Sequence, residues 1–227
     1  MADLRFFYGT MGCGKSTLAL QNDHNFTAAG LRGRCYTMLD RRGAVISSRT
    51  GLSRPATLVA PDFDFLSVVR SGEPGEPGVR RELDYVICDE VQFYSPQQID
   101  QLALLVDDYG VDVSCYGLTT DFTGRLFAGS QRLLELADEC ARLQVSALCW
   151  CGRRGTHNAR CVDGTVVYEG RQVVVGNTFQ PAPPMEGGEA GSSHATGVSY
   201  ELLCRRHWRA GLNRRGALAA GLVAHRA

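Results

Sequence analysis

The stretch from Gly9 to Ser16, GTMGCGKS, constrains this chain more than any other part of it. It matches the template G-x-x-x-x-G-K-[ST] at every fixed position. The apolar run Leu4 to Tyr8 predicts a buried strand directly before it, and Ser16 to Leu20 opens a helix directly after it. A strand followed by a helix is the context that this template requires. We therefore interpret the stretch as a phosphate-binding P-loop.

A loop of this kind predicts a binding site for a polyphosphate. Its glycines let backbone N–H groups point inward, and the positive end of the following helix adds to them. Lys15 is the only lysine in the chain, which suggests that a compact ammonium is needed here to reach the β- and γ-phosphates. The Ser16 hydroxyl is the expected Mg²⁺ ligand. The predicted nucleotide-binding residues are Gly9, Thr10, Met11, Gly12, Cys13, Gly14, Lys15 and Ser16.

A second informative stretch runs from Leu83 to Phe93, where an apolar strand ends in Asp89 and Glu90. A P-loop enzyme needs two acids opposite its loop, one to hold Mg²⁺ through water and one to handle the nucleophile. The alternative is a solvated strand end, since acidic pairs are common there. The presence of the P-loop favours the functional interpretation.

Strand and helix patterns alternate along most of the chain, which predicts an α/β fold with a parallel sheet covered on both faces. Residues 43–56, rich in Gly, Ser and Arg, predict a mobile surface loop. The further predicted strands are 34–39, 57–59, 111–118 and 145–150, and the further predicted helices are 62–70, 96–109 and 130–143, the last capped by Ser130.

From Cys149 onward the character of the sequence changes. Two short clusters, Cys149 with Cys151 and Cys204 with His207, offer four soft ligands. Between them, 165–168 and 171–175 predict a hairpin that turns at Glu169-Gly170, before a long loop from Gly176 to Ser199. This arrangement predicts a small zinc-stapled module. In an extended segment both C-x-C sulfurs would point the same way; the alternative is ordinary reduced cysteines.

Composition sets further bounds. At 227 residues and 44% hydrophobic content the chain can bury a full core, and its formal net charge of zero argues against a nucleic-acid or membrane-surface protein. No apolar run approaches the roughly 20 residues of a membrane helix, and no signal peptide precedes the first strand. We expect a cytoplasmic protein whose nine cysteines are reduced thiols or metal ligands.

Taken together, these residues resemble one family, the thymidine kinases shared by animals and many bacteria. The resemblance covers nearly the whole chain, from about Leu4 to His207. Its specific elements, in order, are GTMGCGKST, DEVQF at 89–93, YGLTTDFTGRLF at 116–127, VVVG at 173–176 and YELLCRRH at 200–207. The resemblance implies a RecA-like P-loop core at 1–148 and a zinc-bearing lasso domain at 149–208. The Arg- and Ala-rich composition after Trp208 predicts a frayed or disordered tail at 209–227.

The resemblance also implies roles for particular residues. Glu90 resembles the general base that takes the proton of the deoxyribose 5′-hydroxyl, while Asp89 and Ser16 resemble the magnesium shell. Asp40, Arg42 and Gln92 fall near the phosphate site. The residues that look like the nucleoside pocket are Met11, Leu118, Phe122, Asn158, Val174 and Tyr200. The zinc ligands would be Cys149, Cys151, Cys204 and His207. The family suggests a homotetramer.

The reaction expected from this resemblance is transfer of a phosphoryl group from ATP to the 5′-hydroxyl of thymidine, in nucleotide salvage. Backbone groups of Val173, Val174, Val175 and Gly176 would read the base edge, which admits thymine and uracil and opposes cytosine. The main alternative is a RecA-like ATPase coupled to nucleic acid, with the same loop and acids. A non-catalytic zinc module is a third possibility, for which an intact P-loop and Glu90 would have no purpose.

Overall fold

The computed structural model describes residues 2–38, 43–48, 51–69, 83–145, 147–172, 177–178 and 197–222. The chain forms two units, one of Met1–Thr119 and Leu126–Val145, the other of Thr120–Arg125 and Ser146–Ala227. The loop Thr120–Arg125 therefore belongs to the second unit, although its neighbours in sequence belong to the first. The domain boundaries expected after residues 148 and 208 stay a prediction. In the described part of the chain, no helix has the length and apolar character needed to cross a bilayer.

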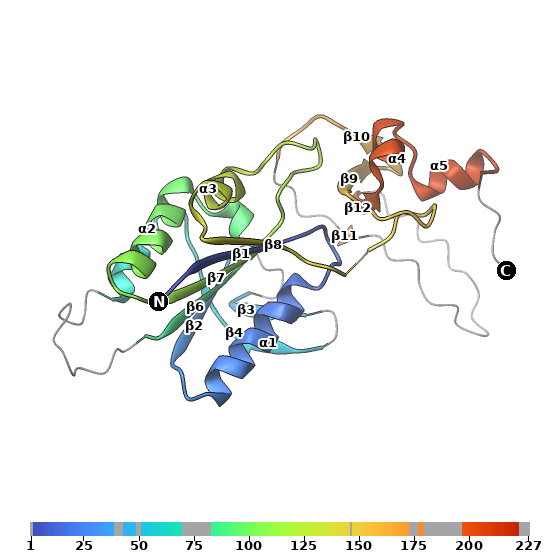
Figure 1. Ribbon diagram of the computed structural model, residues 1–227. Helices are drawn as coiled ribbons and strands as arrows, with labels where there is room; N and C mark the ends of the chain where they lie inside the picture. The colour runs from blue at the N-terminus through green and yellow to red at the C-terminus, as the bar shows by residue number, and fades with distance from the viewer. Residues whose placement is uncertain are drawn as a thin grey trace. The chain divides into compact units, whose positions relative to one another are not determined.

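A six-stranded sheet forms the centre of the first unit (Figure 1). Its strand order is β5-β2-β6-β7-β1-β8, and every neighbouring pair is parallel. The strands are β1 (Leu4–Tyr8), β2 (Gly33–Thr37), β5 (Thr57–Leu58), β6 (Tyr85–Asp89), β7 (Asp112–Gly117) and β8 (Glu139–Arg142). The predicted α/β core with a parallel sheet is thus confirmed. Its strands end together at one edge, where ligands of such sheets bind.

Helices cover both faces of this sheet (Figure 1). The helix α1 (Lys15–Ala28) packs on one face, and α2 (Pro96–Asp107) and α3 (Ala128–Leu136) pack on the other. In β6, Val86 and Cys88 join the core under α2, whereas Tyr85 and Ile87 join the core under α1. Because both faces are buried, the strand reads as a continuous apolar run rather than an alternating one.

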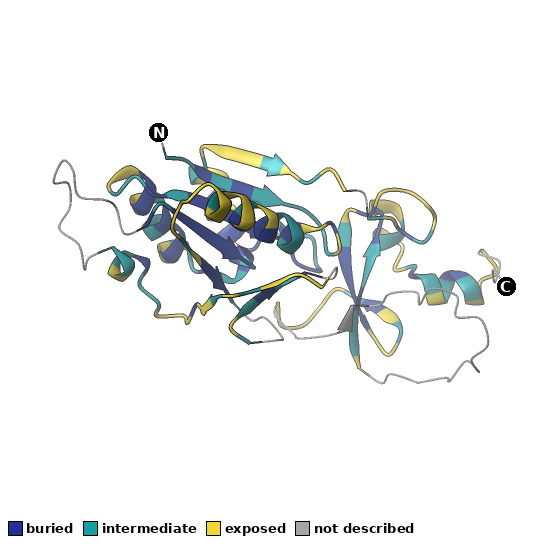
Figure 2. Ribbon diagram, turned by 90° about the horizontal axis from the view of Figure 1, so that it is seen from below, coloured by how far each residue is buried: buried dark blue, intermediate teal, exposed yellow. Residues whose placement is uncertain are grey.

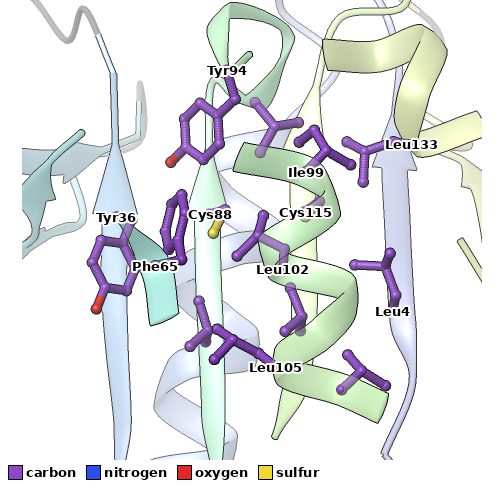
Figure 3. Packing of buried hydrophobic residues seen from close by; sticks show 14 of the residues in the cluster. Leu4, Tyr36, Phe65, Cys88, Tyr94, Ile99, Leu102, Leu105, Cys115 and Leu133 are labelled. Atoms are coloured by element: carbon purple, nitrogen blue, oxygen red, sulfur yellow. The ribbon is translucent and has the colours of Figure 1, made fainter. Parts of the chain in front are cut away.

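The larger core lies between α2 and the sheet (Figure 3). Ile99, Leu102 and Leu105 of α2 are fully buried and point toward the strands. Burial of each such side chain stabilises the fold by about 1.5–3 kcal/mol. The helix begins as its sequence predicts: Pro96 occupies the first turn, and Ser95 and Gln98 form a reciprocal capping box.

The second unit contains a four-stranded sheet in the order β10-β9-β12-β11. Its strands are β9 (His157–Val162), β10 (Thr165–Val167), β11 (Asn177–Thr178) and β12 (Val198–Leu203), followed by the short helices α4 (Arg205–Arg209) and α5 (Arg214–Ala219). Figure 2 shows buried residues along the strands of both units. A small core of Cys149, Ala159, Cys161, Val166, Leu203 and Cys204 fills the second unit.

Two predictions in the first 70 residues are wrong. Residues 43–56 are not a mere loop, because Val45–Ser47 (β3) pairs antiparallel with Ser53–Pro55 (β4). Ile46 is fully buried in the core under α1, although most of the surrounding segment is Gly, Ser, Thr and Arg, which predicts a loop. The helix expected over 62–70 is only a 3₁₀ turn, η1 (Phe65–Val68), capped by the Asp64 carboxylate.

Three later predictions are also wrong. Helix α3 stops at Leu136 and β8 follows, because 139–142 adds to the sheet edge beside β1. Ser130 does not cap α3; its hydroxyl donates to the Leu118 carbonyl at 2.5 Å. Among the described residues of 145–150, no strand forms beyond a single bridge from Leu148 to Arg154. The residues Thr165–Val167 pair antiparallel with β9, and of the second predicted hairpin strand, residues 173–175 lie outside the described residues.

Candidate active site and metal centre

The P-loop adopts a conformation that its glycines allow. Gly12 and Gly14 have φ values of 76° and 86°, in the left-handed region that favours glycine. A Cβ at Gly9 would lie 2.4 Å from Cys13 Sγ, so that position also needs glycine. Lys15 opens α1, is 8% exposed, and its Nζ donates to the Thr10 carbonyl at 3.0 Å. The lysine is therefore held inside the loop where an anion would bind.

Asp89, which is buried, and Ser16, which is partly buried, form a polar pair beside the loop. Asp89 ends β6 and is 3% exposed. Burial and the neighbouring charge of Glu90 raise the pKa of Asp89 to about 7, although a hydrogen bond from Ser16 and the charge of Lys15 oppose the shift. A desolvated carboxylate next to a hydroxyl is a fitting pair of hard ligands for Mg²⁺, which would compensate the buried charge.

Glu90 follows Asp89 in a strained backbone conformation. Its φ of 56° is left-handed, which costs a non-glycine residue roughly 1–2 kcal/mol. Gln92 Nε2 donates to Glu90 Oε2 at 2.5 Å, and Gln92 Oε1 accepts from the Leu118 N–H at 3.0 Å. Gln92 is 2% exposed, so the amide holds the Glu90 carboxylate against the end of β7. Strain of this kind persists where the surrounding structure fixes the residue, commonly at functional sites.

The four predicted zinc ligands come together in the second unit. Their ligand atoms all lie within 4.8 Å of one another. Cys149 Sγ is 3.5 Å from His207 Nδ1, and Cys151 Sγ is 4.0 Å from Cys204 Sγ. Tetrahedral zinc with ordinary bond lengths requires about 3.5 Å between S and N and about 3.8 Å between two S atoms. The residues therefore fit a structural zinc ion.

The C-x-C pair reaches this cluster through a turn, so the extended segment expected for it is wrong. The Gly152 N–H donates to the Cys149 carbonyl at 2.9 Å, and Gly152 has a φ of 80°. Trp150, between the two cysteines, stacks on His207 at 4.1 Å between ring centroids and donates to the Leu212 carbonyl. Burial raises the pKa of the Cys149 thiol to about 11, so metal binding would have to displace a proton.

Three of the predicted nucleoside-pocket residues belong to the second unit: Phe122, Asn158 and Tyr200, all buried. Arg160 brings two of them together. Its guanidinium lies 3.7 Å from the centre of the Phe122 ring and donates to the Tyr200 hydroxyl at 2.9 and 3.0 Å. It also donates to the carbonyls of Arg171 and Gln172. Met11 and Leu118 belong to the first unit.

Sequence reasoning missed Arg160 and Asp121. Arg160 is 3% exposed. The sequence feature that could have identified it is a single charged residue inside the otherwise uncharged strand His157–Val162. Asp121 anchors its loop, because its Oδ1 accepts from Thr123 N–H, Thr123 O–H and Arg125 N–H. Its Oδ2 accepts from Gln172 Nε2 at 3.0 Å. The predicted site residues Asp40, Arg42, Val173, Val174, Val175 and Gly176 lie outside the described residues.

The first unit has a glycine-rich P-loop, a buried carboxylate with a neighbouring hydroxyl, and a second carboxylate at one sheet edge. These features define a P-loop enzyme that transfers a phosphoryl group. The family model described as thymidine kinase matches residues 2–180. The chain belongs to the thymidine kinase family.

Relatives of that name match the chain over nearly its whole length. A thymidine kinase of Streptomyces coelicolor is 51% identical over 98% of this chain and 95% of its own length. One from Streptomyces avermitilis is 49% identical with the same coverage. A more distant one, from Salmonella choleraesuis, is 38% identical over 100% of this chain and 99% of its own. The similarity therefore includes both units.

Proposed function

We propose that the P-loop and the Asp89–Glu90 pair carry out phosphorylation of thymidine in this member of the family. The enzyme uses ATP to phosphorylate thymidine, as its family does in nucleotide salvage. Lys15 and the loop amides stabilise the charge on the transferring group, and Ser16 and Asp89 would hold Mg²⁺, which neutralises phosphate charge when bound. Glu90 accepts the proton of the 5′-hydroxyl.

The observation that carries this proposal is the environment of Glu90. A general base must be held in one orientation with its carboxylate free to accept a proton. The Gln92 amide contacts one carboxylate oxygen, Glu90 Oε2, which leaves Oε1 for the substrate hydroxyl. Asp89 is buried beside Ser16, so the two neighbouring carboxylates have different partners and different roles.

The residues expected to bind the nucleoside are Met11 and Leu118 of the first unit, and Phe122, Asn158 and Tyr200 of the second unit. The distances from Arg160 to Phe122 and Tyr200 support a preorganised wall made of these two rings. Backbone groups of Val173 to Gly176 would read the base edge. This recognition admits thymidine and deoxyuridine and opposes deoxycytidine, which lacks the ring N–H.

We assign a structural zinc ion to Cys149, Cys151, Cys204 and His207, supported by the tetrahedral spacing of their ligand atoms.

The same proposal includes Asp40, Arg42 and Gln92 near the phosphate site, a homotetrameric state, a cytoplasmic location, and no nucleic-acid or membrane partner. Light scattering at the working concentration would measure the oligomeric state directly.

A steady-state kinase assay with purified full-length protein tests the proposed function. Thymidine and deoxyuridine should be phosphorylated with ATP and Mg²⁺, while deoxycytidine and purine deoxynucleosides should be poor substrates. The same preparation is assayed for ATP hydrolysis with and without single-stranded DNA. Hydrolysis stimulated by DNA, together with no nucleoside phosphorylation, would instead favour the nucleic-acid-coupled ATPase.

A further inference from the structure

A pocket of about 910 Å³ lies in the second unit and shares one residue, Cys204, with the zinc cluster. Five of the residues that line it are arginines: Arg153, Arg154, Arg205, Arg206 and Arg209. We call it the arginine pocket. The other residues that line it are Thr156, His157, Cys204 and Ala210, so none of the described residues in the lining is a carboxylate. All of these residues belong to the second unit, so the arginine pocket does not depend on the P-loop.

The described residues of the second unit carry more positive than negative charge. Residues 147–172 and 197–222 contain nine arginines and only three acids, Asp163, Glu169 and Glu201, in a chain whose net charge is zero. Within the part of the chain that the structure describes, Arg153, Arg205, Arg206 and Arg209 form no ion pair with a carboxylate. Their guanidinium groups are therefore available to an external anion.

Zinc would not neutralise this charge. Three thiolates and a neutral histidine around Zn²⁺ carry a net charge of −1, against five guanidinium charges in the pocket lining. Burial lowers the pKa of His157, and the charge of Arg205 lowers it further, so the imidazole is disfavoured as an additional cation. Counted over the described residues, the arginine pocket therefore keeps a positive excess in the zinc-loaded protein.

We propose that the arginine pocket is a second anion site, which binds a polyphosphate group separately from the P-loop. The planar fork of arginine matches phosphate oxygens, and several forks around one cavity suit an anion with several negative charges rather than a single carboxylate. The volume lies within the range of pockets that hold small molecules of nucleotide size. The ligand is thus a free polyphosphate or the polyphosphate chain of a nucleotide.

Equilibrium dialysis of the full-length, zinc-loaded protein with inorganic tripolyphosphate tests this proposal by counting bound ligands per chain. Wild type should bind two, one at the P-loop and one in the arginine pocket. Arg205→Gln/Arg209→Gln should bind one, with affinity for the second weakened roughly 10²-fold because two charge-assisted contacts are lost. Lys15→Ala should lose the P-loop ligand and keep the other.

The matched control is Arg171→Gln/Arg215→Gln, which removes the same charge from the same unit outside the pocket and should still bind two. Zinc content and melting temperature check that each variant is folded; Arg153→Gln/Arg205→Gln provides a second pocket variant. One ligand per wild-type chain, or equal binding by pocket variant and control, would overturn the proposal.

Two further arms identify the ligand source. If the pocket substitutions weaken the binding of ATP as much as the binding of tripolyphosphate, the ligand is a nucleotide. If they weaken the binding of tripolyphosphate alone, the ligand is free polyphosphate. A 20-nucleotide single-stranded DNA is added as a competitor. If the DNA displaces labelled tripolyphosphate from the arginine pocket at a lower concentration than unlabelled tripolyphosphate does, the site is a nucleic-acid surface and the proposal fails.

Discussion

The Gln92 amide nitrogen lies 2.5 Å from Glu90 Oε2, and its amide oxygen accepts the Leu118 N–H at 3.0 Å. A single buried side chain therefore links the proposed base, which follows β6, to the end of β7. The Gly117 position leaves room for it, since a Cβ there would lie 2.8 Å from Gln92 Oε1. We infer that Gln92 positions Glu90 rather than contacting the nucleotide alone.

Replacement of Gln92 by Leu should lower kcat by roughly 10- to 100-fold, because the Glu90 carboxylate loses its orientation. The Leu118 N–H also loses its partner, which should destabilise the protein by about 1–3 kcal/mol. The pH profile of kcat separates these effects: a shifted acidic limb reports on Glu90, whereas lost stability alone leaves the limb in place. The exposed Gln131→Leu on α3 serves as control.

Arg160→Gln should raise the KM for thymidine tenfold or more while the KM for ATP stays nearly constant. The substitution removes the cation from the Phe122 ring and the hydrogen bonds that join Tyr200 to the carbonyls of Arg171 and Gln172. Arg160→Lys keeps the charge but cannot reproduce the fork, so we expect only partial recovery. Equal changes in both KM values would contradict a role confined to the nucleoside side.

Metal analysis should find about one zinc per chain, and Cys204→Ser should lose it and lower the melting temperature. Cys204 is buried and lies at the start of α4, so loss of zinc should unfold the second unit before the first. Cys140→Ser is the matched control, because Cys140 is exposed and outside the cluster. A metal-free preparation with full activity and unchanged stability would contradict the zinc site and show that the four residues are three ordinary thiols and a histidine.

Thymidine should exceed deoxycytidine in kcat/KM by at least tenfold, with deoxyuridine close to thymidine. Each mismatched buried donor or acceptor costs about 1–3 kcal/mol, and cytosine presents two mismatches, so their sum of about 2 kcal/mol or more exceeds a tenfold ratio. Competition assays that contain both nucleosides measure the ratio directly. Comparable turnover of deoxycytidine would show that backbone groups of Val173 to Gly176 do not read the base.

Much of the first unit is predictable because its signals are local. The P-loop template specifies its own strand and helix, and Ser95-Pro96 with the apolar period of 99–106 specifies α2. The strand β8 is not predictable in this way. Glu139 and Arg142 are charged and exposed, and the segment becomes a strand only because β1 offers an open edge beside it.

The second unit is harder to predict because several turns compete. Asp163-Gly164 and Glu169-Gly170 both lie beside β-favouring runs, and the structure uses the first, with Asp163 and Gly164 at φ values of 49° and 80°. The metal ligands were predictable as residue types, but the turn that joins Cys149 and Cys151 was not. Arg160 acts through residues up to 40 positions away, which a local pattern cannot reveal.

The central claim, that Glu90 is the general base, is tested most directly by kcat of Glu90→Gln at saturating ATP and thymidine. The amide keeps the size of the side chain but cannot accept the proton, so kcat should fall by roughly 10²-fold or more. ATP affinity, measured by calorimetry, should change little, whereas Lys15→Ala should weaken it. An unchanged kcat for Glu90→Gln in a folded, ATP-binding protein would contradict the account.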